Sequence, residues 1–176
     1  MMKLVINLAT FLLISGTSLA QHPAQPEIDC LATNIYWEAR NQPVSGMIAV
    51  AAVTRNRVFN PAYPSTYCSV ITQGPIIESW RTRKDKSLPN YRREYYPVRH
   101  RCQFSWYCDG RSDDIPFKDL DIYDIAQSIA RRAYWGYLKD NTNESTHYHA
   151  HYVNPDWADP TAFTVMIGDH LFYKLQ

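Results

Sequence analysis

Apolar residues recur at helical spacing in several segments of the chain. From Glu27 to Ala39, the residues Leu31, Ile35 and Glu38 follow one another at spacings of four and three, so a helix places all three on one face. We predict that this helix ends at or near Glu38. It follows a proline-containing linker, which we assign to residues 21–27.

Two further helices are predicted from composition and spacing. Residues 45–58 are apolar on nearly all sides, which is typical of a helix buried in the centre of a domain. Residues 117–138 carry one apolar stripe, and residues 67–72 form a short helix or turn. Residues 75–101 show no clear period and contain several prolines, so we predict an irregular insertion there.

The pattern changes to alternation near the C-terminus. It begins at His147, and residues 164–167 and 171–173 are predicted to be two short strands around Gly168-Asp169. Helices first and strands last indicate a single α+β domain over residues 28–176, mainly helical, with a small C-terminal β-sheet.

The first twenty residues differ from the rest. A short cationic start precedes an apolar run, and the small residues Ser18 and Ala20 lie just before a possible cleavage point at Gln21. This predicts a secretory signal peptide over residues 1–20. A retained anchor is the alternative, but the apolar run is shorter than the roughly 20 residues that span a bilayer. We expect an exported protein, in the periplasm or the cell wall or outside the cell, with no stable membrane insertion after cleavage.

All four cysteines lie beyond that cleavage point. An even number in an exported chain indicates disulfides rather than metal ligation. Cys102 and Cys108 enclose a short loop and are the most plausible pair, which leaves Cys30 for Cys68. Four cysteines nevertheless allow three connectivities.

Charge is uneven along a chain whose formal net charge is only +1. Residues 81–101 contain eight Lys and Arg side chains against Asp85 and Glu94. Most such runs are solvated loops, but an exported protein could use this one to bind cell-wall polymers or anionic lipid head groups. Interleaved tyrosines are also compatible with single-stranded nucleic acid. Export argues against that partner, and we expect none.

Glu38 is the strongest candidate for chemistry, because it occupies an apolar position of its helix. Loss of water raises the pKa of a carboxyl group, so a glutamic acid can stay protonated and serve as a general acid. The alternative is an ordinary solvated glutamate, which is the commoner case. The neighbouring rings of Tyr36 and Trp37 are suited to stacking on sugars.

Two other groups of residues are candidates for binding. The loop between the last two cysteines presents Gln103, Phe104 and Ser105, and it either binds a ligand or only stabilises a turn. His147, His149 and His151 alternate, so a strand places all three on one face, as a zinc site would require.

The three histidines would spread over roughly 13 Å at 3.3 Å per residue, too far to reach one ion. We therefore expect neither a metal nor another cofactor. His147, Tyr148 and His149 are expected to contact a carbohydrate instead, and Trp157 to pack in the core.

Several motifs together resemble one family. They are Asn34–Arg40, Gly46–Val58, the Gln103-Phe104-Ser105 loop, Asn154–Trp157 and Ile167–Tyr173. In this order they resemble the SleB-type cell wall hydrolases, known from spore-cortex-lytic enzymes and phage-type lysins. The resemblance implies a lysozyme-like helical domain with a small sheet that acts on the glycan strands of peptidoglycan as a lytic transglycosylase, with Glu38 as its catalytic glutamate. We expect the protein to be a monomer. The chain departs from the family in its basic segment 75–101.

The number of carboxylates separates the possible mechanisms. A hydrolytic muramidase or glucosaminidase needs a second carboxylate about 5 to 9.5 Å from the first. Asp109 and Asp156 are the available partners, but loop aspartates most often serve turns. A transglycosylase needs only Glu38. A non-catalytic peptidoglycan-binding protein is a third possibility, and a metal amidase that uses the histidines is a distant fourth.

Overall fold

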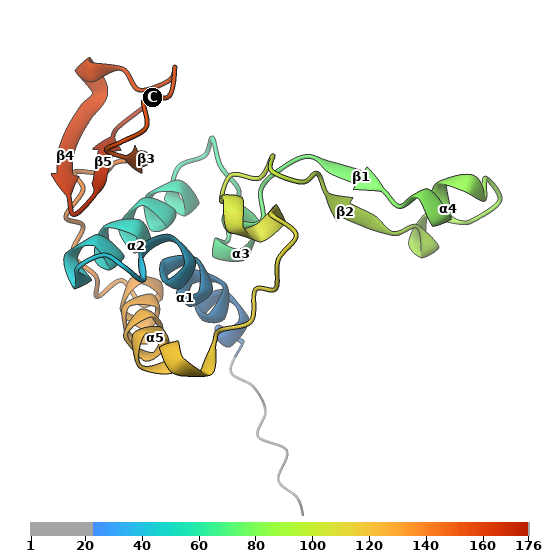
Figure 1. Ribbon diagram of the computed structural model, residues 1–176, viewed down its shortest axis with the longest axis horizontal. Coiled ribbons are helices and arrows are strands. Elements are labelled where there is room, and N and C mark those ends of the chain that lie inside the picture. Colours follow the sequence, from blue (N-terminus) through green and yellow to red (C-terminus); the bar gives the residue numbers. More distant parts are fainter. Residues whose placement is uncertain (1–22, 176) are drawn as a thin grey trace, which may run out of the picture.

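The protein is described by a computed structural model over residues 23–175, so the predicted signal peptide lies outside the described residues. Its body is a group of packed helices with a small sheet on one side, and a long hairpin projects from it (Figure 1). The helices are α1 (Gln25–Ala39), α2 (Val44–Phe59), α3 (Tyr67–Ile71), α4 (Trp80–Lys84) and α5 (Leu120–Tyr134). Short 3-10 helices lie at η1 (Asn90–Arg92), η2 (Ser105–Cys108), η3 (Phe117–Asp119) and η4 (Pro160–Ala162).

Helix α1 begins earlier than predicted. Its first residue is Gln25 and Pro26 lies in its first turn, where the missing N–H of proline costs no hydrogen bond. Residues 25–27 are therefore helical, and their assignment to the linker is wrong. Leu31 and Ile35 are fully buried, as the apolar stripe predicted.

Helix α2 is the central helix of the body. Its Met47, Val50 and Ala51 belong to the core shared with α1, whereas Ala49 and Val53 pack with Phe172 of the sheet. A helix with core on two opposite sides must be apolar nearly all round, which confirms the prediction for residues 45–58.

Helix α5 covers the other side of α1 through Ala126, Ile129 and Ala133. It ends at Tyr134, four residues before the predicted end. Gly136 has a φ of +78°, and the Tyr137 N–H donates to the carbonyl of Arg132 at 2.7 Å, which closes the helix in the left-handed C-terminal turn that glycine favours.

The C-terminal sheet has three antiparallel strands in the order β3-β5-β4: β3 is His147–Ala150, β4 is Phe163–Ile167 and β5 is His170–Tyr173. The two predicted strands are confirmed, and the alternation after His147 is the third. Gly168 turns the chain with a φ of +58°, and the Gln42 side chain accepts from the Asp169 N–H at 2.9 Å. This contact ties the β4–β5 turn to the loop between α1 and α2.

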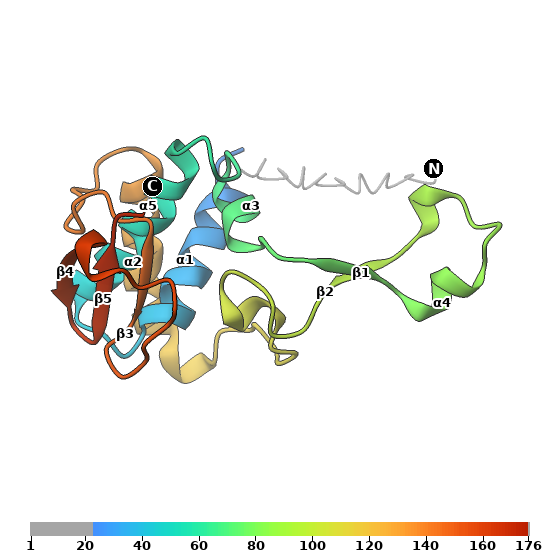
Figure 2. The ribbon, with the colours of Figure 1, turned by 90° about the horizontal axis from the view of Figure 1, so that it is seen from above.

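Residues 75–101 are not irregular. Strands β1 (Ile76–Glu78) and β2 (Tyr95–Pro97) form a hairpin that carries α4 and η1 at its far end and extends away from the body (Figure 2). The prediction was wrong because each strand has three residues and is exposed on both faces, so no alternation develops.

Both expected disulfides are present. Cys30–Cys68 joins α1 to α3, and Cys102–Cys108 closes the loop that contains η2. In the described part of the chain, no helix has the length and apolar character needed to cross a bilayer.

Candidate active site

Glu38 lies in the last turn of α1 and is partly buried. The hydroxyl group of Tyr148 donates a hydrogen bond to its Oε2 atom at 2.9 Å. The partner comes from β3, 110 residues along the chain, so the tertiary fold alone brings the two groups together.

Tyr148 is held firmly where β3 faces the helices. It pairs with Phe172 across the sheet, and its ring lies 5.5 Å from the Phe172 ring and 5.1 Å from the His170 ring. Phe172 is itself fully buried against α2. The hydroxyl of Tyr148 therefore has a fixed position relative to Glu38.

Arg57, in the last turn of α2, is the third charged or polar group of the site and is only 2% exposed. Its Nε donates to the carbonyl of Thr146 at 2.6 Å, and its guanidinium lies 5.3 Å from the centre of the Phe104 ring. With the Gln103 amide oriented so that its oxygen faces Arg57, that oxygen accepts from both Nη atoms at 3.2 Å. These contacts hold a buried positive charge beside Glu38.

Burial dominates the electrostatics of the site. It raises the pKa of Glu38 above its ordinary value, while the Tyr148 hydrogen bond and the Arg57 charge lower that pKa by smaller amounts. The protonated acid is thus favoured, yet the carboxylate form has two partners ready to stabilise it. Burial raises the pKa of Tyr148 well above 10, so its hydroxyl remains a donor.

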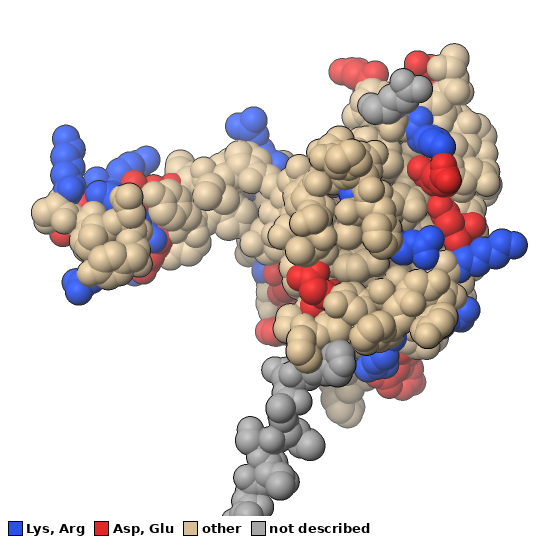
Figure 3. Space-filling model, turned by 180° about the vertical axis from the view of Figure 1, so that it is seen from behind, with Lys and Arg blue, Asp and Glu red and all other residues tan. Residues whose placement is uncertain are grey.

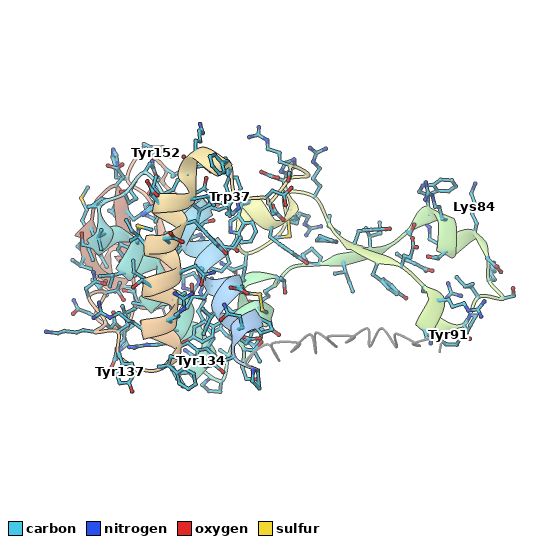
Figure 4. The ribbon with its side chains drawn as sticks, turned by 90° about the horizontal axis from the view of Figure 1, so that it is seen from below. Trp37, Lys84, Tyr91, Tyr134, Tyr137 and Tyr152 are labelled. Atoms are coloured by element: carbon cyan, nitrogen blue, oxygen red, sulfur yellow. A yellow bond between two sulfur atoms is a disulfide. The ribbon has the colours of Figure 1, made fainter. Side chains whose placement is uncertain are left out.

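A small pocket of about 140 Å³ opens onto Glu38 and is lined by Arg57, Gln103, Phe104, Ser105 and Tyr148 as well. Glu38 is the only carboxylic acid among the described residues that line this pocket. A larger hollow of about 330 Å³ adjoins it, shares Ser105 and is lined by Trp37, Arg40 and Trp106. Figure 4 labels Trp37 on the body, near the η2 loop.

A protein-family model described as cell wall hydrolase matches residues 41–173, which is most of the chain. The chain belongs to the cell wall hydrolase family. The match begins three residues after Glu38, so it includes the residues that surround Glu38 but not Glu38 itself.

Curated relatives of this cell wall hydrolase include spore cortex-lytic enzymes. That of Bacillus cereus is 39% identical over 56 residues, covering 32% of this chain and 22% of its own length. That of Bacillus subtilis is 42% identical over 45 residues, covering 26% and 15%. The chain thus matches about a fifth of the length of these relatives.

Two solved structures share the fold of the cell wall hydrolase. The catalytic domain of the Bacillus cereus SleB protein aligns with a TM-score of 0.58 at 24% identity, over 90% of this chain and 97% of that one. The catalytic domain of the germination-specific lytic transglycosylase SleB of Bacillus anthracis aligns equally well, over 89% and 100%. The predicted lysozyme-like α+β fold is confirmed.

The fold of the hydrolase gathers most of the predicted site residues. Gln103, Phe104, Ser105 and Tyr148 line the pocket of Glu38, and Trp37 lines the adjoining hollow. Tyr36 does not belong to either. It is fully buried and its hydroxyl donates to Asp119 at 2.7 Å, so the expectation that it contacts a ligand is wrong.

His147 and His149 do not line the Glu38 pocket. Their rings lie 5.3 and 5.5 Å from the Trp157 ring, and His149 also stacks on Tyr173 at 5.2 Å. Because side chains alternate along a strand, they lie on the face of β3 opposite to Tyr148. Trp157 is 39% exposed, so it covers this outer face and is not part of the core.

Residues 23–175 contain no group of three or more His, Cys, Asp or Glu side chains arranged to hold a metal ion. Burial and the charge of Arg57 lower the pKa of His147 to about 4, so its ring is neutral at ordinary pH. Neither candidate second carboxylate lines the Glu38 pocket, although Asp109 lines the adjoining hollow. Asp109 accepts from the N–H of Arg111 at 2.7 Å within a turn, and Asp156 lies exposed in a loop.

Arg57 is the site residue that sequence reasoning missed. It follows Met47, Val50 and Thr54 at spacings of three, four and three, and all four residues are buried. It is therefore a charged residue on a buried helix face, the same signal that singled out Glu38. Applying that test to both helices would have found it.

Proposed function

We propose that this cell wall hydrolase cleaves the bond between N-acetylmuramic acid and N-acetylglucosamine in the glycan strands of peptidoglycan, as a lytic transglycosylase. The observation that carries the proposal is the environment of Glu38. It is the only carboxylic acid among the residues lining its pocket, burial favours its protonated form, and Tyr148 and Arg57 stabilise its carboxylate. The B. anthracis protein that shares the fold is named a lytic transglycosylase.

In the first step, protonated Glu38 donates its proton to the glycosidic oxygen as the bond to the muramoyl C1 breaks. The N-acetylglucosamine unit leaves as an alcohol, and positive charge develops at C1. Glu38 is now a carboxylate, which the Tyr148 hydroxyl and the Arg57 charge stabilise.

In the second step, the muramoyl C6 hydroxyl attacks C1 and loses its proton to the Glu38 carboxylate. A 1,6-anhydro ring forms, the acid is restored and no water is consumed. One residue therefore serves first as the acid and then as the base, so no second carboxylate is needed.

The test is the Glu38→Gln variant on purified sacculi, with the soluble products identified by mass spectrometry. Loss of a general acid should lower the rate by about 100-fold or more. The matched control is Glu144→Gln, which changes an exposed carboxylate paired with Lys174 on the surface. A Glu38→Gln variant that kept a tenth of the parent rate would contradict the assignment.

The products separate the two enzymatic alternatives. Transglycosylation yields anhydro-muropeptides, whereas a hydrolytic muramidase or glucosaminidase yields products heavier by one water. If Glu38→Gln left the lytic effect of the protein intact, a non-catalytic wall-binding role would be supported instead.

Folding of the variant can be checked through the pH dependence of stability. Because the pKa of Glu38 is raised in the folded state, its contribution to stability is full below its ordinary pKa of 4.5 and is lost as pH rises through the raised value. Glutamine carries no charge to bury, so at pH 7 the variant should be at least as stable as the parent in urea unfolding.

A further inference from the structure

The hairpin formed by residues 76–97, here called the arm, holds its shape without help from the core. At its base the Val98 N–H donates to the carbonyl of Pro75 at 2.8 Å, and farther out the Ser79 N–H donates to the carbonyl of Glu94 at 2.8 Å. Arg93 forms an ion pair with Glu78 at 2.6 Å across the two strands. An ordered projection of this kind presents a defined surface.

The arm exposes more large apolar side chains than its length alone would predict. It contains six of the eighteen large hydrophobic residues exposed in the described chain, although it is 22 residues long. Their exposed fractions run from 50% for Ile77 to 81% for Tyr91. The core uses none of them, so folding does not explain their presence. The six are Ile76, Ile77, Trp80, Tyr91, Tyr95 and Tyr96.

The same arm is basic. Five of its cations form no ion pair within residues 23–175: Arg81, Arg83, Lys84, Lys86 and Arg92. They are concentrated toward the far end, where the space-filling view shows blue side chains projecting in several directions (Figure 3). Figure 4 places Lys84 and Tyr91 on two sides of that end. Arg81 and Lys84 lie over the Trp80 ring and Arg92 lies over the Tyr91 ring, so aromatic rings and positive charges are interleaved.

A hollow on the arm brings the two kinds of group together. Its volume is about 480 Å³, more than three times that of the pocket at Glu38, and Trp80, Tyr96, Arg81 and Arg83 are among its lining residues. Ring faces receive the C–H faces of sugars, and a guanidinium binds a carboxylate through two parallel hydrogen bonds. The hollow therefore fits a sugar unit that carries a carboxylate nearby.

We propose that the arm is a second binding site for the peptidoglycan strand itself, remote from Glu38 and specific for its carboxylate-bearing sugar and peptide units. This rests on the proposed function, because it takes the substrate to be peptidoglycan. The arm would hold the enzyme on the insoluble wall while the pocket at Glu38 acts on one bond at a time. Binding through the arm raises the concentration of glycan strands near the pocket at Glu38. The arm should therefore affect cleavage of the polymer but not cleavage of a short soluble fragment.

The placement of apolar residues favours this polymer over a lipid bilayer. A segment that binds a bilayer gathers its apolar side chains on the one surface that enters the interface. Here four of the six exposed apolar residues, Ile76, Ile77, Tyr95 and Tyr96, lie along the strands nearer the body. Trp80 and Tyr91 lie on α4 and η1 among the cations, and the turn between these two helices contains Lys86, Ser87 and a half-buried Leu88.

The test measures binding of the full chain to insoluble sacculi by co-sedimentation, in the Glu38→Gln background so that cleavage does not remove sites. Two arm variants are compared with it, Trp80→Ala/Tyr96→Ala and Arg81→Gln/Arg83→Gln. Each should weaken binding by about tenfold or more. Matched controls outside the arm are Tyr137→Ala and Arg131→Gln/Arg132→Gln, which alter exposed residues and should stay within about twofold.

Two further measurements test whether the arm recognises carboxylates and whether it acts only on the polymer. Sacculi whose carboxylates have been converted to amides should bind the parent more weakly, with a smaller effect on the arginine variant. With Glu38 restored, the arm variants should cleave a soluble tetrasaccharide fragment at the parent rate and sacculi about tenfold more slowly.

The proposal is overturned if the arm variants bind sacculi as the parent does, or if the parent does not bind sacculi. It is also overturned if the variants lose binding to vesicles of phosphatidylglycerol and phosphatidylcholine but keep binding to sacculi, which would assign the arm to anionic lipid. Failure of the proposed function is a different result: full activity of Glu38→Gln, whatever the arm variants do.

Discussion

At the scale of single residues, the site depends on a balance at Glu38. Burial alone favours the protonated acid, which can donate a proton but is poor at taking one back. The hydrogen bond from Tyr148 and the charge of Arg57 act in the opposite direction. A group that must serve as acid and then as base needs both influences, with the pKa placed near the working pH.

Replacing Tyr148 with phenylalanine tests this balance. The variant loses a hydrogen bond to the Glu38 carboxylate, so the pKa of Glu38 should rise further. Because the proposed reaction begins with protonated Glu38, the alkaline limb of the pH–rate profile on sacculi should move upward by about one pH unit. The maximal rate should fall by about tenfold, since the carboxylate intermediate is less stabilised.

The matched control is Tyr152→Phe, which removes the hydroxyl of a tyrosine that is 80% exposed. Its profile should coincide with that of the parent. A downward movement of the alkaline limb in Tyr148→Phe would refute the role assigned to the hydrogen bond.

At the scale of elements, two disulfides stabilise different parts of the chain. Cys30–Cys68 spans 38 residues and fastens α3 to the helix that carries Glu38. Cys102–Cys108 spans only six and closes the loop that presents Gln103, Phe104 and Ser105 to the pocket. The first is therefore expected to matter for stability and the second for the shape of the site.

Paired serine variants separate the two roles. Loop-closure entropy predicts a loss of about 4 kcal/mol in unfolding free energy for Cys30→Ser/Cys68→Ser and about 2 kcal/mol for Cys102→Ser/Cys108→Ser. Urea unfolding measures both. The second variant should lose the larger share of lytic activity at a temperature where both remain folded, and the reverse order in either measurement would contradict this division.

At the scale of the whole molecule, the arm stands apart from a body built around α1 and α2. Its only buried side chains, Ser79 and Thr82, make their hydrogen bonds within the arm. The body therefore contains the core and the site at Glu38, and the arm adds exposed surface beyond it.

Deleting the arm should leave the body folded. Pro75 and Val98 are already joined by a backbone hydrogen bond, so a short Gly-Ser turn can replace residues 76–97. We expect the melting temperature to change by less than about 5 °C, because no core residue is lost. A much larger fall in a thermal scan would mean that the arm is part of the folding unit.

The sequence by itself predicted the helices of the body and the C-terminal strands, and it singled out Glu38 as the candidate acid. Apolar periodicity records which face of an element is buried, and a charged residue on such a face stands out without any structure. Arg57 carried the same signal in α2. The motifs quoted from the chain also identified the family correctly.

Only the tertiary structure decided how the site is assembled. Tyr148 meets Glu38 because its side chain packs with Phe172 against α2, whereas Tyr36 turns into the core and the histidines face the other side of the sheet. The arm escaped prediction because it buries almost nothing, and a segment with no buried face leaves no periodic pattern to read. Local spacing encodes burial, but contacts between distant segments depend on packing that no local spacing records.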